Sequence, residues 1–458
     1  MKSLAVAVVV ACVSVAWGQS GGTSHTRGAR SQASIANRMS LEEIEAVAMQ
    51  ANPEIRVAAR RIATAEARVS GAGALDDPMA MYRNWGTPLR QPWDWNQAQH
   101  MLMLQQTLPG WGKRGLRSQV AGSEIEVLKL QLEAVRRDVA VRVKKTFYDL
   151  LRNGDELRIH DEQEQLAKQA LESAQIKYTV GKVPQQDVLK AQIATTKLEE
   201  HLIGVEQDGE LARAELNALM GRDPSSALEV MGEYMPVTEI PSLVDLEKMA
   251  LENRPELRAN RAEQNVLLQK EELAKKAYTP DFTVAGGYML MPADASQRNT
   301  YSAEVTINLP WLNKRKHESE IDEVRTMTEA TRAEYEVQRA AIFLEIQQAL
   351  IRAGAARRNV ELYRDTLRPQ AEATFKAAAA AYQHDRTDFL NLIDSQNMML
   401  DVQSSFYRAS AEFDSRVAEL ERAVGTTLPQ RNVQLKAERA VGAALSRPDA
   451  ELQGEEGR

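Results

Sequence analysis

The spacing of apolar residues divides this chain into long stretches with a helical period and short stretches that alternate. In the longest helical stretch the apolar positions recur at steps of three and four, at Ile125, Leu128, Leu132, Val135 and Val139. Such spacing is typical of the packing seam of a coiled coil. No proline interrupts residues 112–178. The pattern therefore predicts one helix of roughly 100 Å, at about 1.5 Å per residue.

Four short segments alternate between apolar and polar residues instead. In residues 301–309 the alternating apolar set is Tyr301, Ala303, Val305, Ile307 and Leu309. Residues 78–85, 101–108 and 280–289 are the other predicted strands. Strands of about nine residues can cross a bilayer at a tilt, so we expect two membrane hairpins. The apolar set of the fourth strand is then expected to face lipid.

The two hairpins belong to two copies of one sequence unit. Residues 49–61, MQANPEIRVAARR, resemble residues 251–263, LENRPELRANRAE, and their prolines are 202 positions apart. A second matching pair follows the hairpins, TLPGWGKRG at 107–115 and NLPWLNKRK at 308–316. Each unit is predicted to contain a helix, a hairpin, a very long helix, a break and a returning helix. The first helical stretch is expected to run over about residues 41–72.

The distance between equivalent residues changes inside the second unit. Gly154 and Gly354 are 200 positions apart, whereas Tyr178 and Tyr382 are 204 positions apart. Four residues, about one helical turn, are therefore inserted in the second long helix, where a coiled coil tolerates them as a stutter. We expect the two long helices to pack in parallel register.

These features divide the chain into six segments. They are a signal peptide (1–18), a disordered leader (19–39), the first repeat (40–221), a linker (222–241), the second repeat (242–425) and a disordered tail (426–458). The leader and the tail are polar and lack apolar periodicity, so we expect both to be dispensable for folding.

The first residues indicate export from the cytoplasm. Lys2 precedes an apolar run over residues 4–16, which is too short to span a bilayer and has the form of a secretory signal peptide. Cleavage after Gly18 is one interpretation. The other is lipidation at Cys12, which lies in a sequence resembling a lipoprotein box. Both interpretations predict a protein of the cell envelope.

Composition narrows the fold class and the chemistry. Aromatic residues make up 5% of the chain, and Ala, Leu, Glu, Gln and Arg are abundant, which favours a mainly α protein with a small β part. A net charge of −7 gives no indication of nucleic-acid binding. Cys12 is the single cysteine, so a disulfide framework or a cysteine metal site cannot form within one chain.

Motifs for catalysis and cofactor binding are missing from the sequence. No HExxH or Gly-x-Ser-x-Gly motif is present, and residues 110–113 lack the spacing of a phosphate loop. The sequence therefore predicts no enzyme activity, no cofactor and no metal site. Met79, Met81, Met101 and Met103 in the first hairpin leave one alternative, a soft-metal contact, although the second repeat contains no counterpart of them.

The breaks after the two long helices are the best functional candidates. Residues 178–190 run from Tyr178 to Asp187-Val-Leu-Lys, and residues 382–394 run from Tyr382 to Asn391-Leu-Ile-Asp394. Both segments place polar and acidic side chains at the far end of a rod of about 100 Å. Loop tips are often polar only because they face water, so this alternative stays open.

The order of helix, hairpin, very long helix, break and returning helix occurs twice behind a signal peptide. In this order of elements the chain resembles the TolC-type outer-membrane efflux factors. The resemblance covers about residues 40–425. It implies a trimer in which four strands per chain form a twelve-stranded membrane β-barrel, continued by the long helices as an α-barrel across the periplasm. Physical chemistry agrees, because hairpins with open edges cannot remain in lipid and four strands cannot close around water.

The resemblance also implies roles for residues at the tips. A periplasmic gate is expected at Asp394, Asn391, Tyr382, Arg386 and Asp187. The family pattern has two aspartates at the constriction, whereas this chain has Asn391 in the place of the first. Docking of a periplasmic adaptor protein is expected at Gly181, Lys182, Asp385 and Thr387.

The sequence thus predicts the outer-membrane channel of a tripartite efflux system. Its expected partners are two further copies of itself, a periplasmic adaptor protein, an inner-membrane pump and outer-membrane lipid. Metal ions or drugs are the expected substrates, and nucleic acid is not expected. The alternative is a secreted helical scaffold or coiled-coil adaptor without a pore, which a soluble periplasmic location would indicate.

Overall fold

The structure, a computed structural model, describes residues 38–428 except 87–88, 90–94, 237–238, 294, 385 and 388. The predicted signal peptide with Cys12, most of the predicted leader and the tail beyond Leu428 lie outside this part. The described α-helices are α1 (Leu41–Ala51), α2 (Pro53–Ala72), α3 (Lys113–Thr179), α4 (Gln185–Leu219), α5 (Leu243–Asn253), α6 (Pro255–Lys275), α7 (Lys314–Leu362), α8 (Arg368–Gln383) and α9 (Phe389–Val424). The described strands are β1 (Arg38–Met39), β2 (Met79–Trp85), β3 (Gln99–Leu108), β4 (Glu229–Val230), β5 (Phe282–Leu290) and β6 (Asn299–Ile307).

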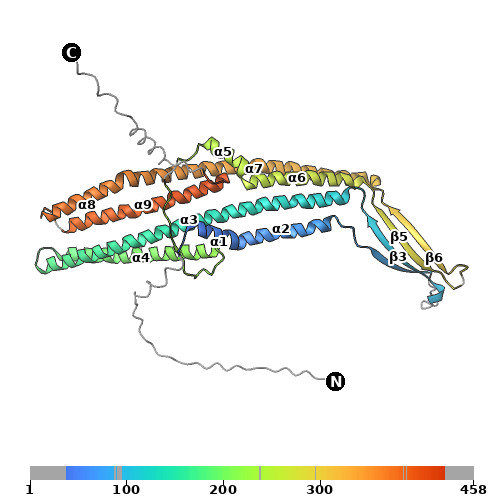
Figure 1. The fold of residues 1–458 in the computed structure, drawn as a ribbon, viewed down its shortest axis with the longest axis horizontal. Coiled ribbons are helices and arrows are strands. Elements are labelled where there is room, and N and C mark those ends of the chain that lie inside the picture. The colour runs from blue at the N-terminus through green and yellow to red at the C-terminus, as the bar shows by residue number, and fades with distance from the viewer. Residues whose placement is uncertain are drawn as a thin grey trace, which may run out of the picture.

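The helices form a long rod with a β-sheet at one end (Figure 1). The far end of the rod contains the α3–α4 and α8–α9 turns, and the short helices α1 and α5 lie near its middle. The parallel pair β1–β4 is the only contact between strands outside the main sheet within the described residues. None of the described helices is both long enough and apolar enough to span a membrane.

The main sheet is a four-stranded antiparallel sheet in the order β2-β3-β5-β6. Both predicted hairpins are confirmed, and β3 of the first repeat pairs with β5 of the second over nine residue pairs. Because directly paired residues share a face, the register gives one face rows such as Tyr82, Leu102, Tyr288 and Tyr301. Val305 and Ile307 lie on this apolar face, and Thr306 lies on the other.

A short-range ionic contact connects the sheet to the helices where the two repeats meet. The ammonium group of Lys113, at the start of α3, lies 2.7 Å from the Asp281 carboxylate, which precedes β5. The Gly110 N–H also donates to Asp281, at 2.7 Å. Lys113 is buried, so its pairing offsets the cost of removing the charge from water.

The predicted helical stretch over residues 41–72 consists of two helices, because the chain bends at Asn52. The residue before a proline is pushed out of the helical region, and Asn52 has φ −58° and ψ 129°. Its side chain accepts hydrogen bonds from the N–H groups of Glu54 and Ile55, which caps α2. Arg254 has a similar backbone, φ −68° and ψ 115°, between α5 and α6.

The first long helix, α3, contains 67 residues and is therefore about 100 Å long, as predicted. The expected parallel packing of α3 against the second long helix is wrong within one chain. The returning helix α9 packs along both α3 and α7 and so separates them. Arg422 of α9 shows this position, since its guanidinium reaches Asp138 of α3 and Glu345 of α7.

The second long helix is divided by a π-helical turn over Tyr363–Leu367, followed by α8. The turn lies between Gly354 and Tyr382, the interval that contains the four inserted residues. A π-helical turn accommodates extra residues by widening the helix locally. Pro369 follows at once and removes one backbone donor from the helix, which is consistent with an irregular turn here.

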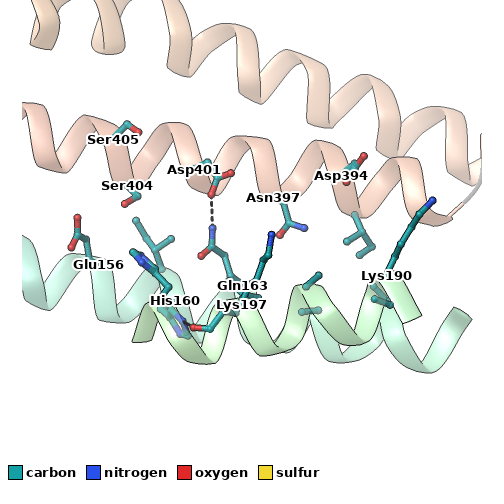
Figure 2. A pocket seen from close by; sticks show the side chains of 18 of the residues that line it. Glu156, His160, Gln163, Lys190, Lys197, Asp394, Asn397, Asp401, Ser404 and Ser405 are labelled. Carbon is teal, nitrogen blue, oxygen red and sulfur yellow. Dashed lines mark hydrogen bonds between the residues drawn. The ribbon is translucent and has the colours of Figure 1, made fainter. Parts of the chain in front are cut away.

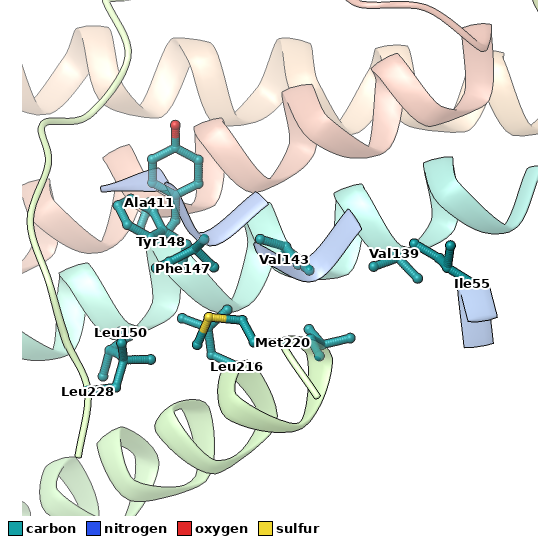
Figure 3. Packing of buried hydrophobic residues seen from close by; sticks show 13 residues of the cluster. Ile55, Val139, Val143, Phe147, Tyr148, Leu150, Leu216, Met220, Leu228 and Ala411 are labelled. Atoms are coloured by element: carbon teal, nitrogen blue, oxygen red, sulfur yellow. The ribbon is translucent and has the colours of Figure 1, made fainter. Parts of the chain in front are cut away.

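The apolar core lies in the middle of the rod and has a counterpart in each repeat. In the first repeat, Ile44, Phe147, Tyr148, Leu216 and Met220 pack between α1, α3 and α4 (Figure 3). The two repeats bury equivalent side chains 202 positions apart, namely Ile44 and Leu246, Ala48 and Ala250, and Ile55 and Leu257. The sequence repeat is thus a repeat of packing.

The predicted seam of α3 is only partly the buried face. Val139 is fully buried, whereas Ile125, Leu128, Leu132 and Val135 are half-buried. The other buried apolar residues between Lys113 and Val139 are Val120, Val127 and Leu130, the first two of which pack against Val266 of α6. The reason is that α3 contacts α2, α4, α6 and α9, so no single stripe describes its packing.

Candidate functional sites: the helix tips and the membrane sheet

The two tips are built by different local means. Gly181 ends α3 in the left-handed region, at φ 71°, where a glycine has no steric penalty. The Lys182 N–H then donates to the Lys177 carbonyl at 2.9 Å, and α4 begins at Gln185. In the second tip, α8 ends at Gln383 and α9 begins at Phe389. Asp385 lies outside the described residues.

A polar groove of about 750 Å³ lies beside the tips, between the α3–α4 pair and α9. Three of the five predicted gate residues line it, namely Asp187 from α4 and Asn391 and Asp394 from α9. Figure 2 shows that Asp394, Asn397 and Asp401 come from α9, opposite Lys190 and Lys197. The two tips therefore contribute carboxylates and ammonium groups to one groove.

Three of the predicted gate residues form contacts within their own tip. Asp187 forms a long ion pair with Lys190, at 3.8 Å, and Asn391 donates to the Thr387 hydroxyl at 3.2 Å. The Arg386 N–H donates to the Ala381 carbonyl at 2.9 Å, which folds the tip back on α8. Tyr382 is 40% exposed near the end of α8. The link from Tyr382 and Arg386 to Asp187 stays a prediction.

Sequence reasoning missed the polar residues that line the inner part of this groove. Gln163 of α3 donates to Asp401 at 2.8 Å, and Arg408 lies 3.1 Å from the buried carboxylate of Glu156. His160 is 2% exposed, and its Nε2 is 2.6 Å from the Leu198 carbonyl. The sequence signal that could have identified them is the presence of polar residues at helical positions where the 3.6-residue period predicts buried apolar ones.

A buried carboxyl group near the middle of the rod was also missed. Asp414 of α9 is 0% exposed and accepts a hydrogen bond from the Met235 N–H at 3.1 Å. Burial raises the pKa of Asp414 to about 8, although this hydrogen bond lowers it. Its other carboxylate oxygen has no hydrogen-bond partner among the described residues. Asp414 therefore fastens the segment before α5 to α9.

The described His, Cys, Asp and Glu side chains contain no group of three or more arranged to hold a metal ion. The sequence interpretation stands that the second repeat has no methionine at the positions equivalent to Met101 and Met103, but the sheet adds a cross-strand neighbour. Met289 of β5 lies directly opposite Met101 of β3, so the second repeat does contribute a methionine to the face that carries Met103.

A sheet with strands of membrane-crossing length and one apolar face, continued by helices of about 100 Å, defines a membrane channel protein with a helical extension. This chain belongs to the outer membrane efflux protein family, which matches residues 46–222 and 246–426. The resemblance to TolC-type efflux factors is thereby confirmed, and the family is one of efflux channels and not of enzymes. This membership favours the channel over the scaffold without a pore.

Individual relatives agree with this assignment. The chain is 22% identical over 316 residues to the cobalt-zinc-cadmium resistance protein CzcC of Cupriavidus metallidurans, covering 69% of this chain and 74% of that protein. The fold is similar to that of CusC, with a TM-score of 0.69 at 14% identity, covering 84% of this chain and 92% of CusC. It is also similar to the outer membrane protein VceC of Vibrio cholerae, with a TM-score of 0.67 at 19% identity, covering 85% and 97%. The predicted fold class, mainly α with an α-barrel and a membrane β-barrel, is confirmed.

Proposed function

We propose that three copies of this chain form one channel that exports metal cations from a pump across the periplasm and the outer membrane. The observation that carries the proposal is the open sheet. Strands β2 and β6 each pair on one side only within the described sheet. Unpaired backbone groups in lipid cost several kcal/mol each, so the edges of neighbouring copies must pair. Three sheets of four strands give a barrel of twelve.

Exposed apolar residues on the helices support assembly of several copies. Val337, Leu344 and Ile351 follow one another at intervals of seven on α7 and are 70%, 59% and 60% exposed. They lie opposite the buried face of α7, which includes Ile342 and Ile346. A stripe at this spacing is typical of a helix that packs against another helix. We assign it to contact with the neighbouring copy.

The substrate class is proposed from the similarity to CzcC. CzcC is named for resistance to cobalt, zinc and cadmium, and its similarity extends over more than two thirds of both chains. By the same relationship, we propose a periplasmic adaptor protein and an inner-membrane pump as partners. We also propose the division of the chain given above, in which the signal peptide, the leader, the first repeat, the linker and the second repeat end at residues 18, 39, 221, 241 and 425.

The tips are proposed as the periplasmic gate. In a threefold assembly each residue near the axis occurs three times, so Asp394 would contribute three carboxylates to one aperture. Asn391 lies about one helical turn away on the same face and adds polarity without charge. Tyr382, Arg386 and Asp187 are proposed to hold the gate closed. Gly181, Lys182, Asp385 and Thr387 are proposed to meet the adaptor protein.

Deleting the gene for this protein in the source cell and restoring it by complementation tests the export proposal. The deletion strain should become more sensitive to zinc, cobalt or cadmium salts, and the wild-type gene should restore resistance. A variant with Val305→Arg, which is expected to disrupt the sheet, should fail to restore resistance. Unchanged sensitivity to all three metals, together with increased sensitivity to dyes or antibiotics, would contradict metal export while leaving the channel assignment intact.

A further inference from the structure

Methionine side chains gather on one face of the membrane sheet. Met81 of β2 is directly opposite Met103 of β3, and Met101 of β3 is directly opposite Met289 of β5. Residues 101 and 103 are two apart on one strand, so all four side chains share a face. Met79 lies on the same face, beside Gln105. Neither repeat alone contains this cluster, because it forms where β3 and β5 meet.

In the proposed trimeric barrel, this face would line the channel. The opposite face carries Leu102, Leu104, Tyr301, Val305 and Ile307, which suit lipid. Besides Trp85, Ala285 and Gly287, the methionine face carries polar residues, among them Gln105, Thr107, Thr283, Ser302, Glu304 and Thr306. A barrel interior is normally polar, so a group of thioethers there calls for a role other than contact with lipid.

The geometry allows two or more sulfur atoms to meet. Directly opposite residues in an antiparallel pair have Cβ atoms about 4.5–5.5 Å apart, and a methionine side chain has three rotatable bonds. Met103 lies next to Gly287, where an added Cβ would be 2.7 Å from the Met103 Cγ. The glycine therefore leaves the space that Met103 occupies.

The present contacts of the sulfur atoms are weak. The Gln105 amide nitrogen is 3.9 Å from the Met79 sulfur, and an Arg83 guanidinium nitrogen is 3.6 Å from the Met81 sulfur. Sulfur is a poor hydrogen-bond acceptor, so a cation that binds thioethers can displace both donors. The charged residues of this face are Glu304, on β6 two strands away from Met103, and Arg83, beside Met81.

We propose that Met81, Met101, Met103 and Met289 form a transient binding site for a soft monovalent cation of the Cu(I) or Ag(I) type. Uncharged thioethers favour such ions over zinc or cobalt. Met101 and Met289 lie in the half of the sheet away from the helices, and Met81 and Met103 lie near its middle. A weak site suits conduction, because an ion must also leave. The inference extends the proposed export of metal cations to one class of ion.

Silver titration of the purified full-length protein in detergent tests the site. Ag(I) is the probe because it does not change oxidation state, and the buffer contains nitrate in place of chloride. The wild-type protein should bind Ag(I), and the variant with all four methionines changed to leucine should bind it at least about tenfold more weakly. The matched control, Met327→Leu with Met398→Leu, changes exposed methionines outside the sheet and should bind as the wild type does.

Two further measurements make the result decisive. X-ray absorption at the silver edge should show sulfur ligands, and these should disappear in the fourfold variant. An equal thermal midpoint for the fourfold variant and the control shows that the sheet is intact. Unchanged Ag(I) affinity in an intact fourfold variant would overturn the site. Because the titration needs no transport, its outcome is independent of whether deletion of the gene alters metal resistance.

Discussion

At the scale of single residues, Asp414 is a buried ionisable group whose protonation is expected to affect the stability of the fold. It is fully buried, it accepts from the Met235 N–H, and its pKa is about 8. The unfolded chain would release this proton at a pH of about 4. The folded state therefore holds more protons between these two values, and its stability falls as the pH rises through that interval.

Asp414→Asn should remove much of this pH dependence, because an amide keeps an acceptor for Met235 without acquiring charge. Thermal unfolding of the detergent-solubilised protein, followed by circular dichroism from about pH 6 to 9, measures the effect. Asp223→Asn is the control, since Asp223 is exposed and its hydrogen bonds with Ser225 lower its pKa. A wild-type midpoint that does not fall with rising pH would contradict the protonated state of Asp414.

Asp394 allows a test of the proposed gate. Three carboxylates around one aperture attract multivalent cations, and the attraction grows as water is excluded. Asp394→Ala should therefore reduce block by such cations in single-channel recordings. Asp401→Asn is a useful comparison, because Asp401 lines the same groove but its carboxylate accepts a hydrogen bond from Gln163.

A second pair of substitutions tests closure itself. Tyr382→Phe combined with Arg386→Ser should raise the conductance of the isolated channel, because it removes links that are proposed to hold the gate closed. An exposed arginine pair contributes only about 0–1 kcal/mol, so few such links have to be broken for the gate to open. Wild-type conductance in this double variant, together with unchanged block in Asp394→Ala, would show that the gate lies elsewhere.

At the scale of elements, the two returning helices end in the same way. Gly221 after α4 and Gly425 after α9 have φ values of 67° and 80°. An added Cβ at Gly425 would lie 2.9 Å from the Arg254 Cα, and at Gly221 it would lie 2.7 Å from the Ala51 carbonyl oxygen. Each glycine thus permits a close approach to the bend between two short helices.

Gly425→Ala should destabilise the protein by about 1–2 kcal/mol from the left-handed backbone alone, and by more because the backbone of Arg254 blocks the methyl group. Gly154→Ala is the matched control inside α3, where no atom lies within 4 Å of an added Cβ. That change should instead stabilise the helix by about 0.5–1 kcal/mol. Thermal midpoints of both variants measure the difference, and equal midpoints would refute this account of the helix end.

The facing of β6 gives a second test at this scale. Val305→Arg should cost roughly 2–4 kcal/mol if the side chain points into the middle of the bilayer, whereas Thr306→Arg on the channel face should cost much less. The amount of assembled, heat-modifiable channel in outer-membrane fractions measures both. Equal losses at the two positions would contradict the two faces assigned to the sheet.

At the scale of the whole molecule, assembly is expected to depend on the exposed stripe of α7. Leu344→Arg places a charge opposite the buried face of this helix, where it does not disturb the fold of the single chain. We expect loss of the trimer in chemical cross-linking and light scattering, with helical content retained. Leu344→Met keeps the side chain apolar and should assemble normally, so a trimer that survives the arginine substitution would place this stripe away from the subunit contact.

Much of the architecture could be predicted because it depends on local periods. The alternation in residues 301–309 predicted β6, and the uninterrupted helical pattern predicted α3, since each pattern reflects which side chains one element exposes to its surroundings. The repeated Pro-Glu sequence predicted two equivalent units, and equivalent residues such as Ile44 and Leu246 are both buried. Periodicity carries this information within one element.

What the sequence by itself determined was therefore the kind of element at each position, the duplication and the family. Tertiary structure alone decided which elements meet. The separation of α3 from α7 by α9, the ionic joint of Lys113 with Asp281, and the meeting of Met101 with Met289 all join residues that are distant in the chain. Such contacts depend on how several faces of each helix and both edges of each strand are shared among neighbours. A one-dimensional pattern records that a face is apolar, but it does not record which neighbour covers it.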